Sequence, residues 1–388
     1  MFVPIANEPR SYSWGSATLI ADYLGRTPSG APEAEVWFGA HPGCPSRVAG
    51  GEHDGAPLGA LLEAEGRQQP ALLLKVLAAA EPLSLQAHPD EARAREGFAR
   101  EDAAGIPRDA PHRSYRDPFS KPEIIVAVTP FEALCGFRSH QAALAPLEAL
   151  AAIDARVAPV ADRVRAGDAL EWLLAGGDEV AAAVAAATEA APRIAAAHPR
   201  DADTIARIAA THPGDPGLLI ALLLHRVALA PGEALFLPAG NVHAYLEGLG
   251  IELMGPSDNV LRGGLTPKHV DVEELLAVAD RSPLADPRLP AEQLDGAVAY
   301  RPAAPFELRH VQGSHEVGAP GERVRGVVLA VSAADVEVDG SQRSMAPSEA
   351  AWIDAEGPLR LDSADAWIAL ERDTPARPDN PWDTPRHS

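Results

Sequence analysis

The feature that most constrains the fold is a change in composition at two points along the chain. From about residue 141 to about residue 212 the chain is rich in alanine, with high helix propensity and few β-branched residues other than valine and isoleucine. The regions on either side contain short apolar runs bounded by proline and glycine, which is typical of strands. The 388-residue chain therefore predicts a mainly β protein with one helical insertion.

The apolar runs outside the insertion have the length of strands. Before it, they include residues 72–77 (LLLKVL) and 123–128 (EIIVAV). After it, residues 227–248 predict two short strands joined by a Pro-Gly turn and followed by a second turn, and residues 270–280 predict one helix. From about residue 290, short strands such as RVRGVVLAVS alternate with turns at the spacing of a β-sandwich or barrel.

These patterns divide the chain into three parts. Residues 1–140 together with 213–289 are expected to form one β domain. Residues 141–212 are expected to form a helical domain that prolines break into several short helices, at Pro146, Pro159 and Pro192. Residues 290–388 are expected to form a C-terminal β domain that ends in a disordered tail, DTPARPDNPWDTPRHS.

The charge balance limits the partners. The formal net charge of −22 argues against nucleic acid or an anionic membrane, because both require a basic face. A small anionic substrate stays possible if a local cationic pocket holds it. The start of the chain lacks the pattern of a signal peptide, no apolar run is long enough to span a bilayer, and the two cysteines, Cys44 and Cys135, are too few for a disulfide framework. We therefore expect a soluble, cytoplasmic protein.

Lysine is rare in this chain. Only Lys75, Lys121 and Lys268 occur, against thirty arginines. A lysine that persists against such a bias indicates a position where the planar, permanently charged guanidinium would not serve. Chance survival on the surface is the alternative, but three stray lysines would be expected to scatter rather than fall in the segments that carry candidate site residues.

Three segments supply possible metal ligands. Gln86 and His88 in PLSLQAHPD are two residues apart, so a strand would point both to one face. Glu123 begins an apolar strand, and His243 follows a glycine turn. This mixed nitrogen and oxygen set suits zinc, although manganese, cobalt or iron(II) could also fit. Each segment alone is weak, since His-Pro pairs that indicate ordinary turns also occur, at His41, His198 and His212.

The third segment is the most specific. GEALFLPAGNVHAYLE has the spacing G-x5-P-x-G-x2-H-x3-E, through Gly232, Pro238, Gly240, His243 and Glu247. It resembles the second metal-binding motif of the cupin superfamily, whose fold is a small double-stranded jelly roll. The proline and glycine would set a tight turn that aims the histidine into the barrel. By the same resemblance, Gln86 and His88 take the place of the first motif, with glutamine as a departure from the general pattern.

That departure points to one subgroup. The chain resembles the type I mannose-6-phosphate isomerases in several ordered blocks that cover most of residues 1–280. These are YSWGS (12–16), AEVWFGAHPGCPSRV (34–48), LLKVLAAAEPLSLQAHPD (73–90), DPFSKPEIIVAVTPFEALCGFR (117–138) and LFLPAGNVHAYLEGLGIELMGPSDNVLRGGLTPKHVDVEELL (235–276). The resemblance implies a catalytic jelly roll, a helical domain and a C-terminal β domain of jelly-roll type.

The resemblance also implies a site. One zinc per chain would be bound by Gln86, His88, Glu123 and His243, and Arg262 would be catalytic. Five further residues match motif positions that line the same pocket, namely Lys121, Tyr245, Glu252, Asp258 and Lys268. The blocks near the N-terminus add Glu35, Trp14 and Trp37 as possible supports, with core packing as the alternative for both tryptophans.

The implied reaction interconverts mannose 6-phosphate and fructose 6-phosphate through a cis-enediol, by a monomer that serves mannose and GDP-mannose metabolism. Arg262 cannot act as a base because guanidinium stays protonated, so we expect it to stabilise the enediolate. Glu252 is the expected general base, with Lys121 and Lys268 as competitors, and Lys268 with Arg262 is expected to hold the phosphate. The alternatives are another cupin enzyme, such as an iron(II) dioxygenase, and a sugar-binding cupin without activity.

Overall fold

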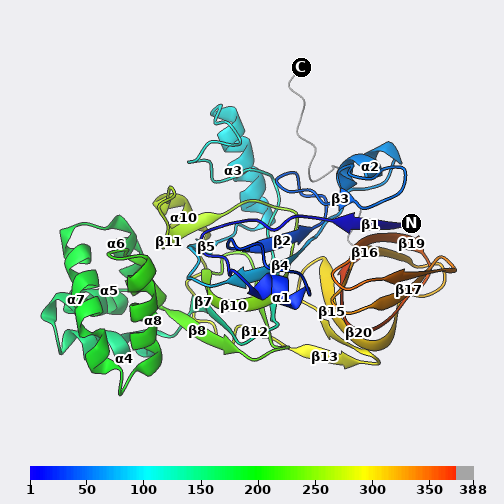
Figure 1. Cartoon of the computed structure of the whole chain (residues 1–388). Helices are drawn as coiled ribbons and strands as arrows, with labels where there is room; N and C mark the ends of the chain where they lie inside the picture. Colours follow the sequence, from blue (N-terminus) through cyan, green and yellow to red (C-terminus); the bar gives the residue numbers. More distant parts are fainter. Residues whose placement is uncertain (373–388) are drawn as a thin grey trace.

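The computed structural model describes residues 1–372 and contains two β regions and a helical block. In Figure 1 the helical block lies on the left, the metal-ligand strands in the centre and the C-terminal strands on the right. The predicted fold class, mainly β with a helical insertion, is confirmed. The predicted disordered tail, residues 373–388, lies outside the described residues.

The first β region carries the segments that the sequence singled out. In residues 1–372 its strands form one ten-stranded sheet that folds back on itself, with the path β11-β5-β10-β6-β9-β12 and the remaining strands attached to β10 and its neighbours. The strands are β2 (Glu35–Phe38), β4 (Leu73–Ala79), β5 (Leu85–Ala87), β6 (Glu123–Ala127), β7 (Phe131–Phe137), β8 (Leu224–Leu229), β9 (Ala234–Leu237), β10 (His243–Met254), β11 (Leu261–Gly264) and β12 (Arg288–Leu289).

Strand β10 joins the two halves of this sheet. Its first residues pair with β5 and β7, and its last residues pair with β4 and β6. The pairing shifts between Tyr245 and Glu247, and Gly248 has φ of +123°, where a Cβ would lie 2.7 Å from the backbone oxygen of Pro130. Glycine therefore permits the bend that lets one strand place both His243 and Glu252 inside the same barrel.

The helical block consists of α4 to α8, and α9 connects it back to the strands. Its elements are α4 (His140–Ala151), η1 (Ala155–Val157), α5 (Ala158–Ala166), α6 (Ala169–Ala175), α7 (Asp178–Ile194), α8 (Pro199–Thr211) and α9 (Gly217–Ala221). The prediction that every proline breaks a helix is wrong, because Pro146 lies inside α4 and Pro192 inside α7. Pro146 is buried among the leucines of the block, so tertiary packing offsets the lost backbone hydrogen bond. Pro159 lies in the first turn of α5, where proline is tolerated.

The second β region is the C-terminal sheet, which also takes in the first strand of the chain. It comprises β1 (Phe2–Ala6), β3 (Arg47–Val48), β13 (Ala291–Leu294), β14 (Ala297–Tyr300), β15 (Phe306–Val317), β16 (Arg323–Ala330), β17 (Ala334–Val338), β18 (Ser341–Met345), β19 (Ala350–Glu356) and β20 (Leu359–Glu371). Strand β1 pairs with β19 over four residues, so the N-terminus belongs to this sheet although the sequence grouped residue 1 onward with the catalytic domain.

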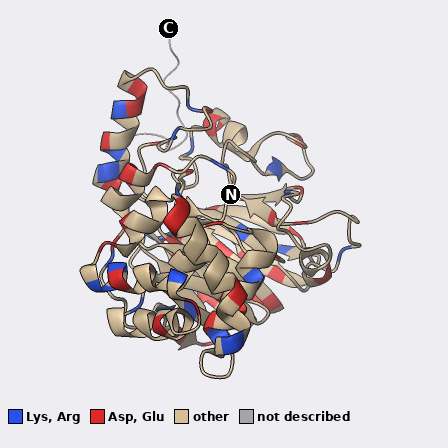
Figure 2. Ribbon diagram, turned by 90° about the vertical axis from the view of Figure 1, so that its left-hand side faces the viewer, with Lys and Arg blue, Asp and Glu red and all other residues tan. Residues whose placement is uncertain are grey.

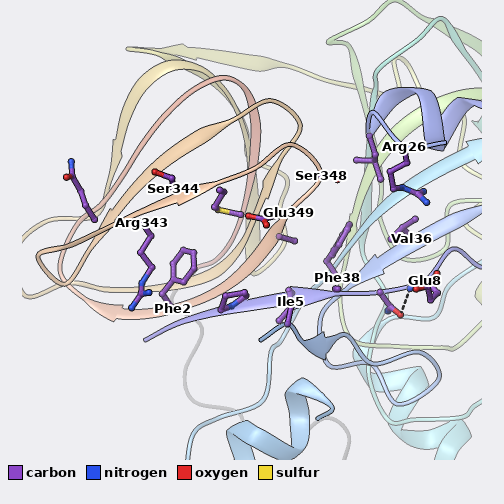
Figure 3. Close-up of a pocket in the computed structure, with 18 residues that line it drawn as sticks. Phe2, Ile5, Glu8, Arg26, Val36, Phe38, Arg343, Ser344, Ser348 and Glu349 are labelled. Atoms are coloured by element: carbon purple, nitrogen blue, oxygen red, sulfur yellow. Dashed lines mark hydrogen bonds between the residues drawn. The ribbon is translucent and has the colours of Figure 1, made fainter. Parts of the chain in front are cut away.

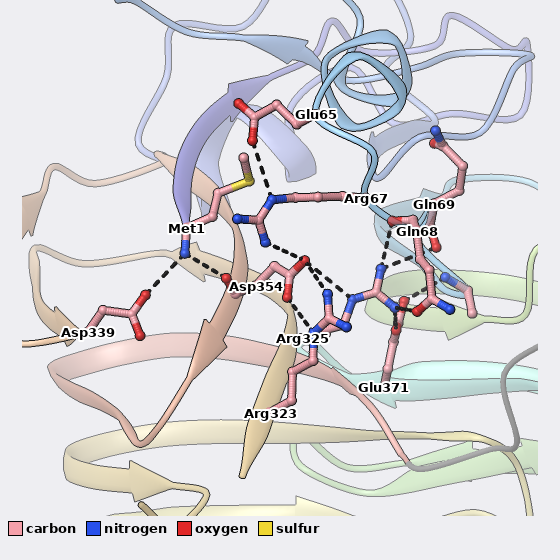
Figure 4. Close-up of polar contacts among 11 residues, drawn as sticks. Met1, Glu65, Arg67, Gln68, Gln69, Arg323, Arg325, Asp339, Asp354 and Glu371 are labelled. Carbon is pink, nitrogen blue, oxygen red and sulfur yellow. Dashed lines mark hydrogen bonds and ion pairs between the residues drawn. The ribbon is translucent and has the colours of Figure 1, made fainter. Parts of the chain in front are cut away.

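The two β regions share buried contacts. One apolar cluster contains Val36 and Leu74 of the first region together with Trp352 and Trp367 of the second. An ionic cluster reinforces the junction: Figure 4 shows Asp354 on β19 facing Arg67, which follows the first-region helix α2 (Leu58–Ala64), and Arg323 on β16. The two β regions are therefore packed against each other through a shared core rather than joined as independent domains.

The remaining helices cover the outside. They are α1 (Leu19–Tyr23), α3 (Glu91–Ala103) and α10 (Val272–Val278). Figure 2 shows acidic and basic residues interspersed along the helices that face the viewer. Within residues 1–372, none of the helices combines the length and the apolar character needed to cross a bilayer.

Candidate metal centre and substrate pocket

Three of the predicted ligands meet inside the first β region. His88 follows β5, Glu123 begins β6 and His243 begins β10. The Oε2 atom of Glu123 lies 3.2 Å from Nε2 of His88 and 3.4 Å from Nε2 of His243, and all three side chains are buried. In the described part of the chain, these residues form the only group of three or more His, Cys, Asp or Glu side chains whose donor atoms all lie within 4.8 Å of one another.

The backbone fixes the tautomer of both imidazoles. The Nδ1 atom of His88 lies 2.7 Å from the carbonyl oxygen of Asn259, and Nδ1 of His243 lies 3.0 Å from that of Asn241. Each Nδ1 must therefore carry the proton and donate it, which leaves a bare lone pair on each Nε2. Burial lowers the pKa of His88 to about 4, so this imidazole is neutral near pH 7.

The lone pairs of this group point at one another. Among the described residues, the buried atoms Nε2 of His88 and Oε2 of Glu123 make no hydrogen bond, although they face each other. Two buried acceptors in that arrangement repel unless a cation lies between them. The donor set of two imidazoles and one carboxylate matches zinc, so the residues present fit the predicted metal.

Gln86 lies beside this group. Its amide is 3.2 Å from Nε2 of His243, and its backbone pairs with His243 and with Arg262 across neighbouring strands. A half-turn of the amide would present Oε1 instead of Nε2, as a metal ligand requires. Gln86 is therefore close enough to complete the predicted set of four.

Lys121 sits at the edge of the same group. Its Nζ lies 2.9 Å from Oε1 of Glu123, which leaves Oε2 to face the imidazoles. Burial alone would raise the pKa of Glu123, but the charge of Lys121 holds it well below its usual range. Glu123 is therefore a carboxylate, as a metal ligand must be.

A second buried ionic group lies behind the metal ligands. The Nζ atom of Lys75 is 2.8 Å from Oε2 of Glu252 and 3.2 Å from Oε1 of Glu35, and the hydroxyl of Tyr245 donates to Oε1 of Glu252 at 2.9 Å. Burial raises the pKa of Glu252. Burial would lower the pKa of Lys75, but Glu252 and Glu35 raise it, so the lysine stays charged. Lys75 was singled out because lysine is rare in this chain, but no role could be predicted for it.

Asp258 is held by His41, whose His-Pro pair was predicted to be an ordinary turn. The backbone N–H of Gly43 donates to Nδ1 of His41 at 3.0 Å, so the Nε2 of His41 carries the proton and lies 3.2 Å from Oδ1 of Asp258. Burial would raise the pKa of Asp258, but His41 and Lys121 lower it to about 2. The ring of Trp37 packs edge-on against His41, at 5.0 Å between centroids.

The cationic candidates gather beyond the metal ligands. Arg262 on β11 pairs with Gln86 on the neighbouring strand β5. It also lines a small pocket with His112 and His269. Burial and the neighbouring charge of Arg116 lower the pKa of Arg262, and burial together with Arg262 and Arg116 lowers that of Lys268. Arg262, Lys268 and Arg116 therefore influence one another electrostatically. Only the first two were predicted from the sequence.

Other predicted positions lie outside this constellation. Glu247, the last position of the metal motif, is exposed and forms an ion pair with Arg207 on α8. Trp14 packs beside Tyr12, at 5.6 Å between stacked rings. Trp37, in contrast, borders the site: it packs against Leu73 and His41, and Nζ of Lys75 lies 4.9 Å from its ring centroid.

A separate cavity lies away from these residues. It has a volume of about 700 Å³ and lies between β1 and β2 on one side and β18 and β19 on the other. Figure 3 shows Phe2, Ile5 and Phe38 along it, with Arg26 and Arg343 toward opposite ends. None of the predicted ligands lines it.

Comparison with known proteins agrees with this site. Residues 2–140 match the model of the type I phosphomannose isomerase catalytic domain. The mannose-6-phosphate isomerase of Escherichia coli (strain K12) is 39% identical over 290 residues, which covers 70% of this chain and 73% of that protein. The mannose-6-phosphate isomerase of Rattus norvegicus is 29% identical over 328 residues, covering 72% of this chain and 73% of that protein.

Solved structures resemble 96% of the chain. A crystal structure of zinc-bound mannose 6-phosphate isomerase superposes with a TM-score of 0.85 at 30% identity, covering 96% of this chain and 100% of that one. A variant of phosphomannose isomerase from Salmonella typhimurium superposes with a TM-score of 0.86 at the same identity and coverage.

Proposed function

The chain belongs to the type I phosphomannose isomerase family, and on that premise we propose that it interconverts mannose 6-phosphate and fructose 6-phosphate for mannose and GDP-mannose metabolism. The observation that carries the proposal is the convergence of His88, Glu123 and His243, whose donor atoms all lie within 4.8 Å of one another in a buried site. The same family membership argues against an iron(II) dioxygenase and against a sugar-binding protein without activity.

Gln86, His88, Glu123 and His243 would hold one zinc ion per chain. Bound there, zinc keeps a net positive charge and would polarise the carbonyl and hydroxyl oxygens of the open-chain sugar. The proposed zinc site is supported by the orientation of both histidines, whose Nε2 atoms face the site, and by the single carboxylate beside them. We further propose that the chain acts as a monomer in the cytoplasm.

Glu252 is our candidate for the general base. It would take the proton from C2 of mannose 6-phosphate and return it to C1 of the enediol, while the proton of the C2 hydroxyl moves to the oxygen on C1. Burial raises its pKa, which brings a carboxylate closer to the range where it can accept and release a proton near neutral pH. Lys75 and Tyr245 would orient it, so Tyr245 acts through Glu252 in this proposal. Lys121 and Lys268 stay as competing candidates.

The charge of the enediolate needs a fixed cation. Arg262 keeps its proton at any relevant pH, so it would stabilise this charge and position the open-chain sugar. Asp258, ionised and oriented by His41, would accept hydrogen bonds from sugar hydroxyls. Lys268, with Arg262 and the neighbouring Arg116, would hold the phosphate, and Lys121 would contact the sugar beside Glu123.

A coupled assay of fructose 6-phosphate formation from mannose 6-phosphate tests the proposal. Protein loaded with zinc should turn over, and protein stripped by a chelator should not. Absence of turnover by the zinc-loaded protein would favour a binding protein. Bound iron with oxygen consumption would instead favour the dioxygenase.

A further inference from the structure

The loop between Arg262 and Lys268 contains a residue in an unfavourable backbone conformation. Leu265 has φ of +55°, in the left-handed region that a branched side chain rarely adopts, and it is 2% exposed. The preceding Gly264 has φ of +124°. Such a conformation persists only where surrounding contacts determine it, and it is found preferentially at functional sites. The loop must therefore be held by something outside itself.

Asp215 holds this loop from the helical side. It lies between α8 and α9, and its Oδ2 accepts the backbone N–H of Leu265 at 2.9 Å. Its Oδ1 accepts the backbone N–H of Gly217, the first residue of α9, at 2.7 Å. Both oxygens of one carboxylate are thus used, one for each side of the junction. Hydrogen bonds to an ionised acceptor are stronger than neutral ones.

Side-chain packing closes the same junction. A Cβ added to Gly217 would lie 2.8 Å from Cδ2 of Leu265, so only glycine allows the two segments to approach this closely. Leu265 is part of the buried cluster that fills the helical block, together with Leu218 and Leu219 of α9. The loop that carries the two cations is therefore packed into the core of the helical block.

We propose that Asp215 is a positioning residue that holds the loop from Arg262 to Lys268 in the conformation that binds the substrate phosphate. The helical block then contributes to recognition of a phosphorylated sugar through a hydrogen bond rather than through direct contact. This inference rests on the proposed function, because it assumes that Arg262 and Lys268 hold the phosphate.

Two variants test the junction from opposite sides. Asp215→Asn keeps the size of the side chain but replaces one acceptor with an amide donor, so one of the two N–H groups loses its partner. Gly217→Ala keeps the carboxylate of Asp215 but crowds the junction, because the added Cβ would lie 2.8 Å from Cδ2 of Leu265 and 2.9 Å from Oδ1 of Asp215. The matched control is Asp154→Asn, because Asp154 accepts the N–H of Arg156 at 3.0 Å within the same helical block. The readouts are kcat and KM for mannose 6-phosphate, the inhibition constant of inorganic phosphate, zinc content and the thermal midpoint.

Because the phosphate is bound in both the ground state and the transition state, its loss should appear mainly in KM. For Asp215→Asn we expect KM and the inhibition constant of phosphate to rise together by about tenfold, with a smaller fall in kcat, because Arg262 lies at the start of the same loop, and with zinc retained. Gly217→Ala should shift both constants in the same direction, and Asp154→Asn should shift neither.

Two results would overturn the inference. One is a lower thermal midpoint in Asp215→Asn with unchanged KM and unchanged phosphate inhibition, which would make the contact merely structural. The other is a loss of kcat or of zinc without a change in KM. A wild-type protein with no isomerase activity would instead refute the proposed function, so the two failures are distinguishable.

Discussion

Two buried histidines show how the β regions differ. His88 in the first region and His315 in the second are each held by a bond from Nδ1 to a backbone carbonyl, 2.7 Å long in both cases. The Nη1–H of Arg309 donates a hydrogen bond to Nε2 of His315 at 2.9 Å, whereas Nε2 of His88 faces the unprotonated oxygen of Glu123. The same way of fixing a histidine thus serves packing in one sheet and a metal ligand in the other.

The interiors differ in the same way. A buried cluster of the second region consists of valine, alanine, leucine, isoleucine and methionine side chains. The buried carboxylates of this region, Asp354 and Glu307, are each paired with arginine. The first region encloses Lys75, Glu252 and Glu123 among its strands. Chemistry therefore follows from the inward-facing side chains and not from the sheet itself.

Substitution of the two histidines should separate these roles most strongly. His88→Ala should lose bound zinc and reduce kcat/KM by at least about a thousandfold, since the metal supplies several kcal/mol of charge stabilisation. His315→Ala should keep zinc and full activity and lower only stability. Metal analysis, the coupled assay and circular dichroism measure these outcomes. Full activity in His88→Ala, with the fold retained, would show that the ligand assignment is wrong.

The buried ion pairs should respond unequally. Lys75→Met leaves Glu35 and Glu252 without their cation, and loss of one partner of a buried pair costs about 3–5 kcal/mol in free energy of unfolding. Arg309→Met should cost less, because Glu307 keeps its contact with Arg301 at 2.9 Å. Urea denaturation of both variants measures the difference. An equal cost would mean that the interior of the first region is no more dependent on charge pairing than the second.

Much of this comparison is predictable from sequence. The strand texture, the helical insertion and the four proposed metal ligands follow from periodicity and from long motif blocks, and the structure brings His88, Glu123 and His243 together as expected. These features are local, or they are fixed by turns such as the one at Gly240, where φ is +78°. Local rules suffice for these features because the conformation of each segment is determined by its own residues.

What depended on distant contacts was missed. Lys75 has no visible partner in its own strand, and its carboxylates arrive from β2 and β10. His41 looked like a turn because its partner Asp258 lies more than two hundred residues away. Pro146 stays helical because the core packs around it. The pairing of β1 with β19 cannot be read from the amino-acid pattern of either strand alone. In each case the deciding energy is tertiary.

Two buried aspartates should show opposite pH dependence. Burial raises the pKa of Asp117 to about 6, so its contribution to stability is present below its unfolded pKa of about 4 and is lost as pH rises through 6. Despite burial, Arg323 and Arg67 lower the pKa of Asp354, so its contribution is present above about pH 4 and is lost as pH falls.

Denaturation of Asp117→Asn and Asp354→Asn against the wild type at about pH 4 and about pH 7 tests these signs. Relative to wild type, Asp117→Asn should gain up to about 3 kcal/mol between the two conditions, because the variant has no charge to bury. Asp354→Asn should be most destabilised at the higher pH. The same pH trend for both variants would contradict the contrast between a carboxylate held by backbone and amide hydrogen bonds and one paired with arginine.

The smallest effect is expected at a position that belongs to the metal motif by sequence alone. Glu247 lies on β10 four residues after His243, but its side chain is exposed and pairs with Arg207. An exposed ion pair contributes little, so Glu247→Ala should change the free energy of unfolding by less than about 0.5 kcal/mol and leave zinc and kcat/KM unaltered. Loss of zinc in this variant would mean that the strand presents a different face to the metal. That result would weaken the assignment of His243 as well, because both residues take their orientation from the same strand.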